Sequence, residues 1–333
     1  MTIIALDVGG TGSRATVCGD GERVVSGPGV ELVDGCVSYE AALDALKEQL
    51  CIHSPVSSVA MGAAGLMARA DAPNVAADLG RRWAAETIVV ASDAVTSLVG
   101  AWGVTGGAVI AAGTGVVALG TDLATTWKRA DGWGPWVGDR GSGAWIGAQG
   151  LDAALRRADG RRGGSSRLRD AAHRRYGTLA DLPTALRRTS NPAAVLAGFV
   201  PDVVEAADAD DDVARRILTE AAGHLSDAAS AVLGPAVPPR VALIGGISRI
   251  DRIARAWAEA MAVAHTEAEY AVGSGSSLEG AVRLAEQAAG SVPPTSHPPF
   301  ISVFTGRSSD MRSGERIACV HSSNQQTTNK ERA

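Results

Sequence analysis

Residues 7–14 read Asp-Val-Gly-Gly-Thr-Gly-Ser-Arg, and this stretch sets a pattern that the rest of the chain follows. A short apolar, β-branched run at residues 2–6 precedes it, and a second run continues over residues 14–18. Short apolar runs separated by glycines predict a strand, a turn and a second strand. A third short strand is predicted over residues 23–26.

The same stretch has the composition of an anion-binding turn. Asp7 ends a buried strand, where a carboxylate is costly unless a cation or hydrogen-bond donors lie nearby. Gly9 and Gly10 leave backbone amides free to face an anion, and the hydroxyl groups of Thr11 and Ser13 add further donors. The combination suits a polyphosphate with magnesium near the aspartate. It also suits an ordinary glycine hairpin with a capping aspartate.

The opening pattern returns after a glycine-rich joint at residues 103–107. An apolar run at 108–112 leads into the turn Gly113-Thr114-Gly115. A second run follows at 116–120, and a third candidate strand lies at 125–129. Both halves of the chain therefore begin with strand, turn and strand, which indicates an internal repeat. The second turn predicts another phosphate-binding loop, although plain hairpin turns look the same.

Strands and helices alternate elsewhere, as in an α/β protein. Apolar and amphipathic spacing predicts helices at 39–51, 74–86 and 92–102, and strands at 56–61 and 87–91. The second half is predicted to be mostly helical over 143–233, followed by elements at 240–244 (strand), 251–263 (helix), 270–272 (strand) and 278–288 (helix). Residues 291–333 are rich in Ser, Thr, Pro and Asn without an apolar period, so they are predicted to be disordered or loosely attached.

Asp93 is the candidate general base. It stands where the predicted strand at 87–91 ends and a helix begins, a common place for catalytic groups in α/β proteins. A carboxylate there can accept the proton of an attacking hydroxyl group during phosphoryl transfer. The alternative is that Ser92 or Asp93 only caps the helix.

A third strand-to-glycine junction, Gly245-Gly246-Ile247-Ser248, follows the predicted strand at 240–244. Glycines at such a junction can let an adenosine lie close against the backbone. Trp133 lies in another glycine-rich segment, where its ring could either stack on a sugar or belong to the core.

Length, composition and charge exclude several classes of protein. The 333 residues are 46% hydrophobic and 20% charged, which is typical of a globular protein. At roughly 150 residues per domain this length predicts about two domains. The net charge of −5 argues against nucleic acid as a partner. Four widely spaced cysteines argue against a disulfide framework or a cysteine zinc site.

The first ten residues, MTIIALDVGG, lack a basic leader and carry an aspartate inside their apolar run, so they do not resemble an export signal. The longest apolar stretch, residues 107–119, is too short and too glycine-rich to span a bilayer. The sequence therefore predicts a soluble, cytoplasmic protein without a membrane partner.

Six motifs occur in one order along the chain: DVGGTGSR at 7–14, SDA at 92–94, AAGTG at 111–115, GWGPWVGDRGSGAWIG at 132–147, LIGGIS at 243–248 and SSLEGAVRLA at 276–285. Together they resemble the BadF/BadG/BcrA/BcrD-type ATPase family, which includes N-acetylglucosamine and glucosamine kinases. The resemblance covers roughly residues 1–289.

The resemblance implies an α/β protein with the two-lobed actin-like ATPase fold, in which duplicated ribonuclease H-like domains enclose an interlobe cleft. The expected N-terminal lobe is residues 1–105, completed by a C-terminal helix at 277–289. The expected C-terminal lobe is residues 106–276 with a helical insertion, and residues 291–333 form the tail.

The resemblance also implies an ATP-dependent kinase that phosphorylates the 6-hydroxyl of N-acetylglucosamine or glucosamine, with ATP and Mg²⁺ as cofactors and a homodimer as a possible assembly. Asp93 is the implied base, and Asp7 is implied to hold magnesium through water. The implied ATP-binding residues are Gly9, Gly10, Thr11, Ser13, Arg14, Gly113, Thr114, Gly115, Gly245, Gly246 and Ser248. The implied sugar-binding residues are Gly65, Thr114, Trp133 and Asp139.

Two departures from the kinases concern the sugar. Residues 138–142 read Gly-Asp-Arg-Gly-Ser, whereas the kinases usually have glutamate at the position of Arg140. Near residues 30–33 the kinases tend to have an asparagine that contacts the sugar, and this sequence has Val-Glu-Leu-Val there. An ATPase that activates a dehydratase or reductase is a second hypothesis, but it needs iron–sulfur cysteines, and the chain has none between Cys51 and Cys319. A catalytically idle sugar sensor is a third hypothesis.

Overall fold

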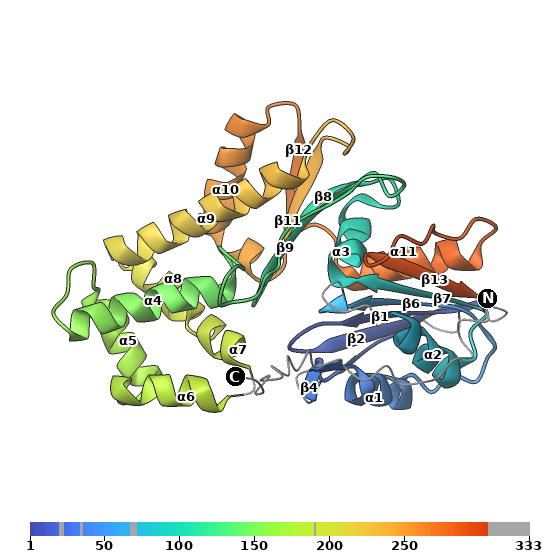
Figure 1. The fold of residues 1–333 in the computed structure, drawn as a ribbon, viewed down its shortest axis with the longest axis horizontal. Helices are drawn as coiled ribbons and strands as arrows, with labels where there is room; N and C mark the ends of the chain where they lie inside the picture. Colours follow the sequence, from blue (N-terminus) through green and yellow to red (C-terminus); the bar gives the residue numbers. More distant parts are fainter. Residues whose placement is uncertain (20–22, 34–35, 67–71, 190, 306–333) are drawn as a thin grey trace, which may run out of the picture.

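The computed structural model describes residues 1–19, 23–33, 36–66, 72–189 and 191–305. Two β-sheets, each covered by helices, form two lobes that lie side by side in Figure 1. The first lobe contains the N-terminus, and the second carries a long helical insertion whose outer part extends away from the first lobe. The predicted α/β class and two-lobed architecture are confirmed.

The sheet of the first lobe has the strand order β13-β7-β6-β1-β2-β3. β1 pairs antiparallel with β2 and parallel with β6, and β6 pairs parallel with β7. The strands are β1 (Thr2–Val8), β2 (Ser13–Cys18), β3 (Arg23–Gly27), β6 (Val56–Ala63), β7 (Thr87–Ser92) and β13 (Ile301–Thr305). A separate small hairpin consists of β4 (Glu31–Val33) and β5 (Cys36–Ser38).

The sheet of the second lobe repeats this topology with the strand order β10-β9-β8-β11-β12. β8 pairs antiparallel with β9 and parallel with β11, as β1 does with β2 and β6. The strands are β8 (Gly107–Ala112), β9 (Val116–Thr121), β10 (Trp127–Asp131), β11 (Arg240–Ile244) and β12 (Glu269–Val272). The predicted internal repeat is therefore a repeat of strand order and direction.

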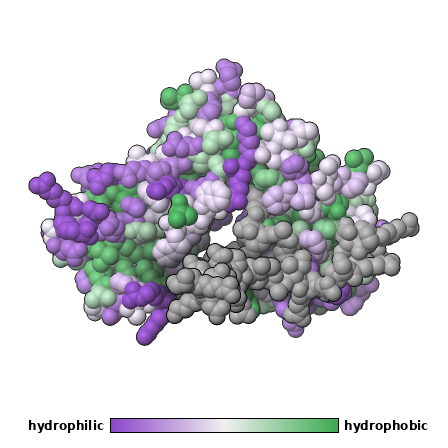
Figure 2. Space-filling view, viewed as in Figure 1, coloured by the Kyte–Doolittle hydropathy of each residue, from purple (hydrophilic) through white to green (hydrophobic). Residues whose placement is uncertain are grey.

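Helices cover both faces of the sheets. In the first lobe the helices are α1 (Glu40–Leu50), α2 (Ala72–Trp83), α3 (Asp93–Trp102) and α11 (Ser277–Ala289). The helices of the second lobe are α4 (Gly143–Ala158), α5 (Ser166–Tyr176), α6 (Leu182–Arg188), α7 (Pro192–Ala197), α8 (Val200–Asp208), α9 (Asp212–Val232) and α10 (Asp251–Ala264). Hydrophilic residues gather at the outer end of α4 to α6, at the far left of Figure 2. Among the helices in the described ranges, none has the length and apolar run needed to cross a membrane.

One hydrophobic cluster joins the two lobes, and we call it the interlobe core. Val89 and Ala60 enter it from the first sheet, and Val109 and Leu119 enter it from the second. Helix α3 contributes Leu98 between them, and α11 contributes further apolar residues. Burial of apolar area therefore stabilises the contact of both sheets with α3.

Glycines allow α3 and α11 to touch through their backbones. A Cβ added at Gly280 of α11 would lie 1.7 Å from the carbonyl oxygen of Thr96. A Cβ added at Gly100 of α3 would lie 2.1 Å from the carbonyl oxygen of Ser276. No larger residue fits at either position unless the helices move apart, so these glycines set the distance between them.

The prediction of a disordered tail is wrong for the part of it that the structure describes. Residues Ile301–Thr305 form β13, which pairs antiparallel with β7 from Ile301↔Ala91 to Thr305↔Thr87. Side chains alternate, because Val303 faces the interlobe core while Phe304 packs on the opposite face of the sheet. The exposed edge of β7 supplies hydrogen-bonding groups that composition alone does not reveal. Residues 306–333 of the predicted tail lie outside the described residues.

Replacing Gly280 by alanine should destabilise the protein by about 1–3 kcal/mol, because the added methyl group overpacks a backbone contact. The measurement is the free energy of unfolding in urea. Gly223→Ala is the matched control, since Gly223 is an exposed glycine of α9 whose added Cβ meets nothing within 4 Å. This control should gain about 0.5–1 kcal/mol from helix propensity. An unchanged stability for Gly280→Ala would contradict the close contact.

Candidate active site

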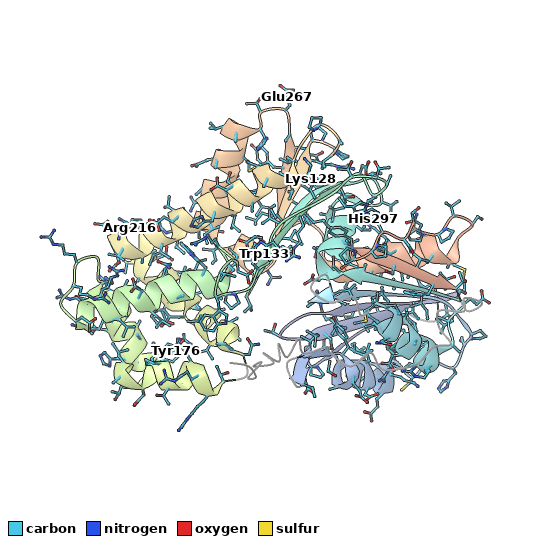
Figure 3. The ribbon with its side chains drawn as sticks, in the orientation of Figure 1. Lys128, Trp133, Tyr176, Arg216, Glu267 and His297 are labelled. Atoms are coloured by element: carbon cyan, nitrogen blue, oxygen red, sulfur yellow. The ribbon has the colours of Figure 1, made fainter. Side chains whose placement is uncertain are left out.

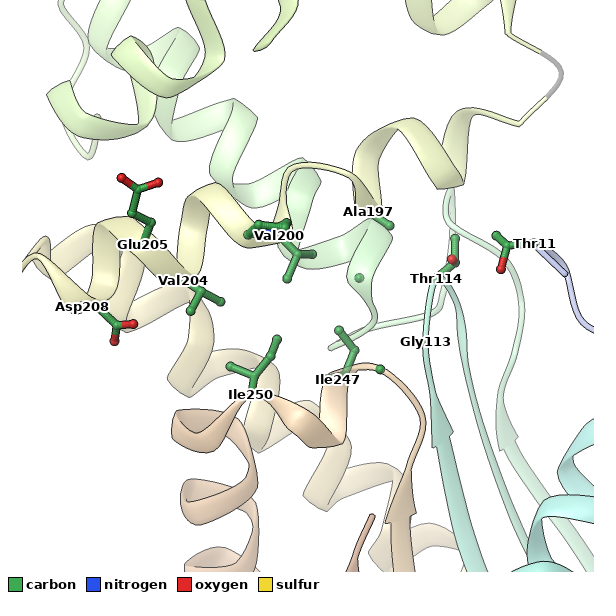
Figure 4. A pocket seen from close by; sticks show the side chains of 13 residues that line it. Thr11, Gly113, Thr114, Ala197, Val200, Val204, Glu205, Asp208, Ile247 and Ile250 are labelled. Carbon is green, nitrogen blue, oxygen red and sulfur yellow. The ribbon is translucent and has the colours of Figure 1, made fainter. Parts of the chain in front are cut away.

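Two cavities meet at the glycine-rich turns. One, the carboxylate cavity, has a volume of about 520 Å³ and is lined by Asp93 and Asp139 among others. The second, the apolar cavity, has a volume of about 810 Å³ and lies mainly against α7 and α8 (Figure 4). Thr11, Gly113 and Thr114 line both cavities, so the turns of both lobes stand at their junction.

The two turns lie at equivalent places in the repeat, since residues 9–12 join β1 to β2 and residues 113–115 join β8 to β9. Each turn is closed by its own hydrogen bond, from Gly9 N–H to the Gly12 carbonyl and from Gly113 N–H to the Gly115 carbonyl. A Cβ added at Gly10 or Gly113 would meet nothing within 4 Å, so the space in front of both turns is open. Such open amide-lined turns suit an anion.

Helix α4 begins at the same place and packs its first turn against the second glycine turn. Its N-cap is Ser142, whose hydroxyl accepts a hydrogen bond from Trp145 N–H. The next two amides, of Gly143 and Ala144, donate to the carbonyls of Gly113 and Thr114. The amides of the first turn of α4 are therefore already hydrogen-bonded, and this 16-residue helix contributes the positive end of its dipole to the second turn.

Asp93 is the first residue of α3 and lines the carboxylate cavity. Its pKa is raised from the ordinary value of 3.8 to about 6, first because the side chain is buried and second because Asp7 carries a negative charge nearby. One carboxylate oxygen accepts a hydrogen bond of 2.9 Å from Ala94 N–H. The helix cap itself is made by Ser92, whose hydroxyl accepts from Val95 N–H, so capping does not account for Asp93.

Asp7 and Arg14 form a cross-strand pair on β1 and β2, with a distance of 2.7 Å between their side-chain nitrogen and oxygen atoms. The side chain of Asp7 is 14% exposed and that of Arg14 is 47% exposed. Ser13, the neighbour of Arg14, points to the other face of the sheet, where its hydroxyl lies against Gly27. Because side chains alternate along a strand, the Ser13 hydroxyl lies on the face opposite Arg14, and its contact with phosphate stays a prediction.

Asp139 is held in the segment between β10 and α4. It is only 7% exposed, and one carboxylate oxygen accepts from Gly134 N–H at 3.0 Å. The carboxylate of Asp131 fixes the segment by accepting from the amides of Asp139 and Arg140 at 2.6 and 3.0 Å. Burial raises the pKa of Asp139, and the charge of Asp131 raises it further, while the hydrogen bond from Gly134 opposes both.

Gly115 brings the second turn against Asp139. A Cβ at this position would lie 2.6 Å from a carboxylate oxygen of Asp139. Only glycine leaves room for the carboxylate and the turn to touch. The predicted phosphate loop and the predicted sugar-binding aspartate are therefore neighbours in the structure.

The tryptophan of this segment is exposed rather than part of the core. Trp133 is 70% exposed, and the guanidinium carbon of Arg129 lies 4.9 Å from the centre of its ring. Figure 3 shows Trp133 at the junction between the second sheet and the helical insertion. Gly132 and Gly134 line the carboxylate cavity, whereas Trp133 stands outside its lining.

The two glycines that follow β11 line different cavities. Gly246 lines the apolar cavity and Gly245 lines the carboxylate cavity. Ser248 is 5% exposed, and its hydroxyl donates to the carbonyl of Gly245 at 2.8 Å. Ser248 therefore braces the turn and does not face either cavity.

The structure brings ten of the predicted site residues to the two cavities: Gly10, Thr11, Gly65, Asp93, Gly113, Thr114, Gly115, Asp139, Gly245 and Gly246. Six others lie outside both linings: Asp7, Gly9, Ser13, Arg14, Trp133 and Ser248. Asp7 still acts on the site, through its charge on Asp93.

Sequence reasoning missed the walls of both cavities. The helical insertion supplies most of the apolar cavity through Ala197, Val200, Pro201, Val204, Glu205 and Asp208. The spacing of Val200, Val204 and Asp208 along one helix face could have indicated a shared surface. Figure 4 shows Glu205 and Asp208 at the end away from Thr11 and Thr114. Arg129, Asn191 and Ser97 of the carboxylate cavity were also missed.

Within the described residues, no three His, Cys, Asp or Glu side chains come together as a metal-binding group. Asp7 lies outside both cavity linings, but its carboxylate stands two residues before the first turn. Mg²⁺ in nucleotide sites is usually held by the phosphates, by waters and by one or two carboxylates. The residues present therefore fit a magnesium ion that arrives with a nucleotide.

The comparisons with known proteins agree with this architecture. The model of the BadF/BadG/BcrA/BcrD ATPase family matches residues 4–282, so the chain belongs to this family. The match takes in both glycine turns and Asp93. None of the curated proteins matches the chain significantly.

Solved structures show the same fold. A candidate N-acetylglucosamine kinase from Chromobacterium violaceum is 25% identical, with a TM-score of 0.65 over 84% of this chain and 97% of that one. A second candidate N-acetylglucosamine kinase, from Porphyromonas gingivalis, is 19% identical, with a TM-score of 0.63 over 84% and 96% of the two chains. A ROK family glucokinase from Streptomyces griseus, solved with glucose and AMPPNP, is 18% identical, with a TM-score of 0.50 over 86% and 100%.

The raised pKa of Asp93 predicts a pH-dependent stability. Between pH 3.8 and about 6 the folded protein keeps a proton on Asp93 that the unfolded chain has lost. Folding stability contributed by this group therefore falls as the pH rises through that interval and stays lower above it. Asp93→Asn removes the buried charge and should stabilise the protein at pH 8 by about 1–3 kcal/mol.

Urea unfolding of both proteins at pH 8 and pH 5 checks this expectation. The stability gained by Asp93→Asn should be larger at pH 8 than at pH 5. The exposed Asp212 of α9 offers a matched control, and Asp212→Asn should show no such difference. A gain that does not depend on pH would contradict the raised pKa.

Proposed function

We propose that the chain is an ATP-dependent kinase that transfers the γ-phosphoryl group of ATP to the 6-hydroxyl group of an amino sugar, N-acetylglucosamine or glucosamine. The observation that carries the proposal is the meeting of the two cavities at Thr11, Gly113 and Thr114. Asp93, a carboxylate with a raised pKa, lines the carboxylate cavity and not the apolar cavity.

The apolar cavity is the proposed nucleoside site. Its walls combine Val200, Val204, Ile247 and Ile250 with the open backbone of Gly246, a lining that suits a flat nucleobase. The two glycine turns and the positive end of α4 lie at one end of this cavity. A triphosphate extending from a base in this cavity would reach the turns of both lobes, where amides can bind its oxygens.

The carboxylate cavity is the proposed sugar site. Asp139 offers a carboxylate oxygen toward Gly115, next to the proposed phosphate position. Arg129 adds hydrogen-bond donors, and Gly65 lets the backbone of the first lobe approach from the other side. A polyol needs both acceptors and donors, and this lining supplies both. The similarity to the Chromobacterium violaceum protein supports an amino sugar as the acceptor.

The proposed reaction needs one proton acceptor. The oxygen of the sugar hydroxyl attacks the γ-phosphorus, and its proton passes to a carboxylate oxygen of Asp93. The bond between the γ-phosphorus and the bridging oxygen breaks, and ADP leaves with that oxygen. Magnesium bound with the nucleotide would neutralise phosphate charge. Asp7 would hold the magnesium ion through water, and the ion pair with Arg14 would keep the Asp7 carboxylate in place before the ion binds.

We also propose that the protein acts in the cytoplasm, because ATP is supplied there.

Asp93→Asn should lower the turnover number for sugar phosphorylation by about 100- to 10,000-fold, the usual contribution of a general base. The dissociation constant of ATP should stay within about threefold, because the apolar cavity does not include Asp93. Coupled ADP release and isothermal titration measure the two quantities. Asp212→Asn again serves as the control and should keep full activity. Turnover within tenfold of the wild type in Asp93→Asn would remove Asp93 from the mechanism.

A sugar panel tests the acceptor. N-acetylglucosamine and glucosamine should raise the rate of ADP release at least tenfold over water, and glucose and N-acetylmannosamine should raise it less. Mass spectrometry of the product should show one added phosphate on the sugar. ADP release that no sugar stimulates would favour an ATPase, and ATP binding without turnover would favour a sensor.

A further inference from the structure

The segment that follows α11 is the least expected part of the structure. It lies beyond the family match, which ends at residue 282. Even so, β13 completes the edge of the first sheet, and Ile301 is only 3% exposed. The segment therefore folds back onto the part of the chain that the family model matches.

Three rings join this segment to the second lobe. Trp127, the first residue of β10, stacks on His297 with ring centres 5.1 Å apart and planes 9° apart. Phe300 stacks on Trp127 at the same centre distance with planes 23° apart. We call Trp127, His297 and Phe300 the aromatic clasp. Figure 3 shows His297 and Lys128, the neighbour of Trp127, on the two sides of the interlobe junction.

A backbone hydrogen bond connects Phe300 of the clasp to Ser92, the residue before the candidate base Asp93. The carbonyl oxygen of Phe300 accepts a hydrogen bond of 2.9 Å from Ser92 N–H. Ser92 is the N-cap of α3, and Asp93 follows it as the first helical residue. A displacement of Phe300 would therefore be passed to the start of α3.

The segment is internally braced, so it can transmit such a displacement. The amide of His297 donates to the Ile301 carbonyl at 2.7 Å, and the amide of Phe300 donates to the His297 carbonyl at 3.0 Å. Val303 N–H donates to the hydroxyl of Ser296 at 2.8 Å. Prolines at 293, 294, 298 and 299 restrict the unfolded segment, which lowers the entropy lost on ordering.

Two stretches of chain join the lobes, and the clasp lies near one of them, because Trp127 pairs with Thr121 and Thr121 pairs with Gly107. This joint runs from α3 to β8 and contains Gly103, Gly106 and Gly107, all with positive φ angles of 69°, 78° and 135°. A glycine joint alone permits rotation of one lobe against the other. The chain crosses between the lobes a second time from β12 to α11, and the interlobe core packs against both sheets. The clasp adds a further contact, from the segment just before β13 to β10, and this contact restricts the rotation that the others leave.

We propose that His297 and Phe300, through their stack on Trp127 and the bond to Ser92, are positioning residues for Asp93 and limit the relative rotation of the lobes. This inference rests on the proposed function for its kinetic consequence. The structural part, a clasp that holds the Ser92 amide, stands without it.

The test compares variants of the full-length protein. Trp127→Ala removes the ring on which both partners stack, and His297→Ala removes only the outer ring. Both should speed hydrogen exchange of the Ser92 amide, measured by mass spectrometry of peptides across β7 and α3. The turnover number with N-acetylglucosamine should fall about tenfold in Trp127→Ala and less in His297→Ala. The KM for ATP should stay within twofold, because no clasp residue lines the apolar cavity.

Phe304→Ala is the matched control, since Phe304 lies on the same strand but packs on the opposite face of the sheet. It should lower the melting temperature by an amount similar to His297→Ala and leave the turnover number within twofold. Trp127→Phe keeps a ring at the stack and should restore most of the turnover lost in Trp127→Ala.

Two results would overturn the proposal. One is unchanged Ser92 exchange in both clasp variants, and the other is a loss of turnover in Phe304→Ala as large as in the clasp variants. If the wild type showed no sugar-dependent turnover, the proposed function would fail. The exchange measurement would still decide whether the clasp holds Ser92.

Discussion

The backbone contact between α3 and α11 is the constraint on which the site depends. Gly100 and Gly280 let the two helices meet without side chains between them. Helix α3 also packs against both sheets in the interlobe core, so its position is set from several directions. Asp93 stands at the first turn of this helix. A carboxylate needs such a fixed support if it is to meet a reacting hydroxyl group at hydrogen-bond distance.

Burial raises the pKa of both Asp93 and Asp139. Water is partly excluded from both carboxylates, and each also lies near another negative charge, Asp7 in one case and Asp131 in the other. Both effects favour the protonated form, so a proton is held more readily than by an exposed carboxylate. For Asp93 this brings the pKa to about 6, close to the pH at which a base can both be ionised and accept a proton.

Local chemistry could be predicted from the sequence, but the direction of side chains could be predicted only in part. The two strand–glycine–strand units could be predicted because glycines interrupt apolar runs in the sequence. The structure shows that they are equivalent, because the two sheets have the same strand order. Asp93 could be predicted as a site residue because it directly follows a predicted strand. The face on which Ser13 lies was predictable, since alternation along β2 places its side chain opposite that of Arg14. The exposure of Trp133 was not predictable, because it depends on a segment that Asp131 holds through backbone amides.

The walls of the apolar cavity and the C-terminal strand required tertiary information. Val200 and Val204 look like core residues of any amphipathic helix, and only the placement of α8 against the turn after β11 turns them toward a cavity. Residues 301–305 read Ile-Ser-Val-Phe-Thr and are mostly β-branched, but a single short strand forms only where an edge is free to receive it. The first sheet would otherwise end at β7, whose exposed edge invites pairing with other chains. Covering that edge with β13 also brings His297 and Phe300 to Trp127, so one strand both protects the sheet and links the lobes.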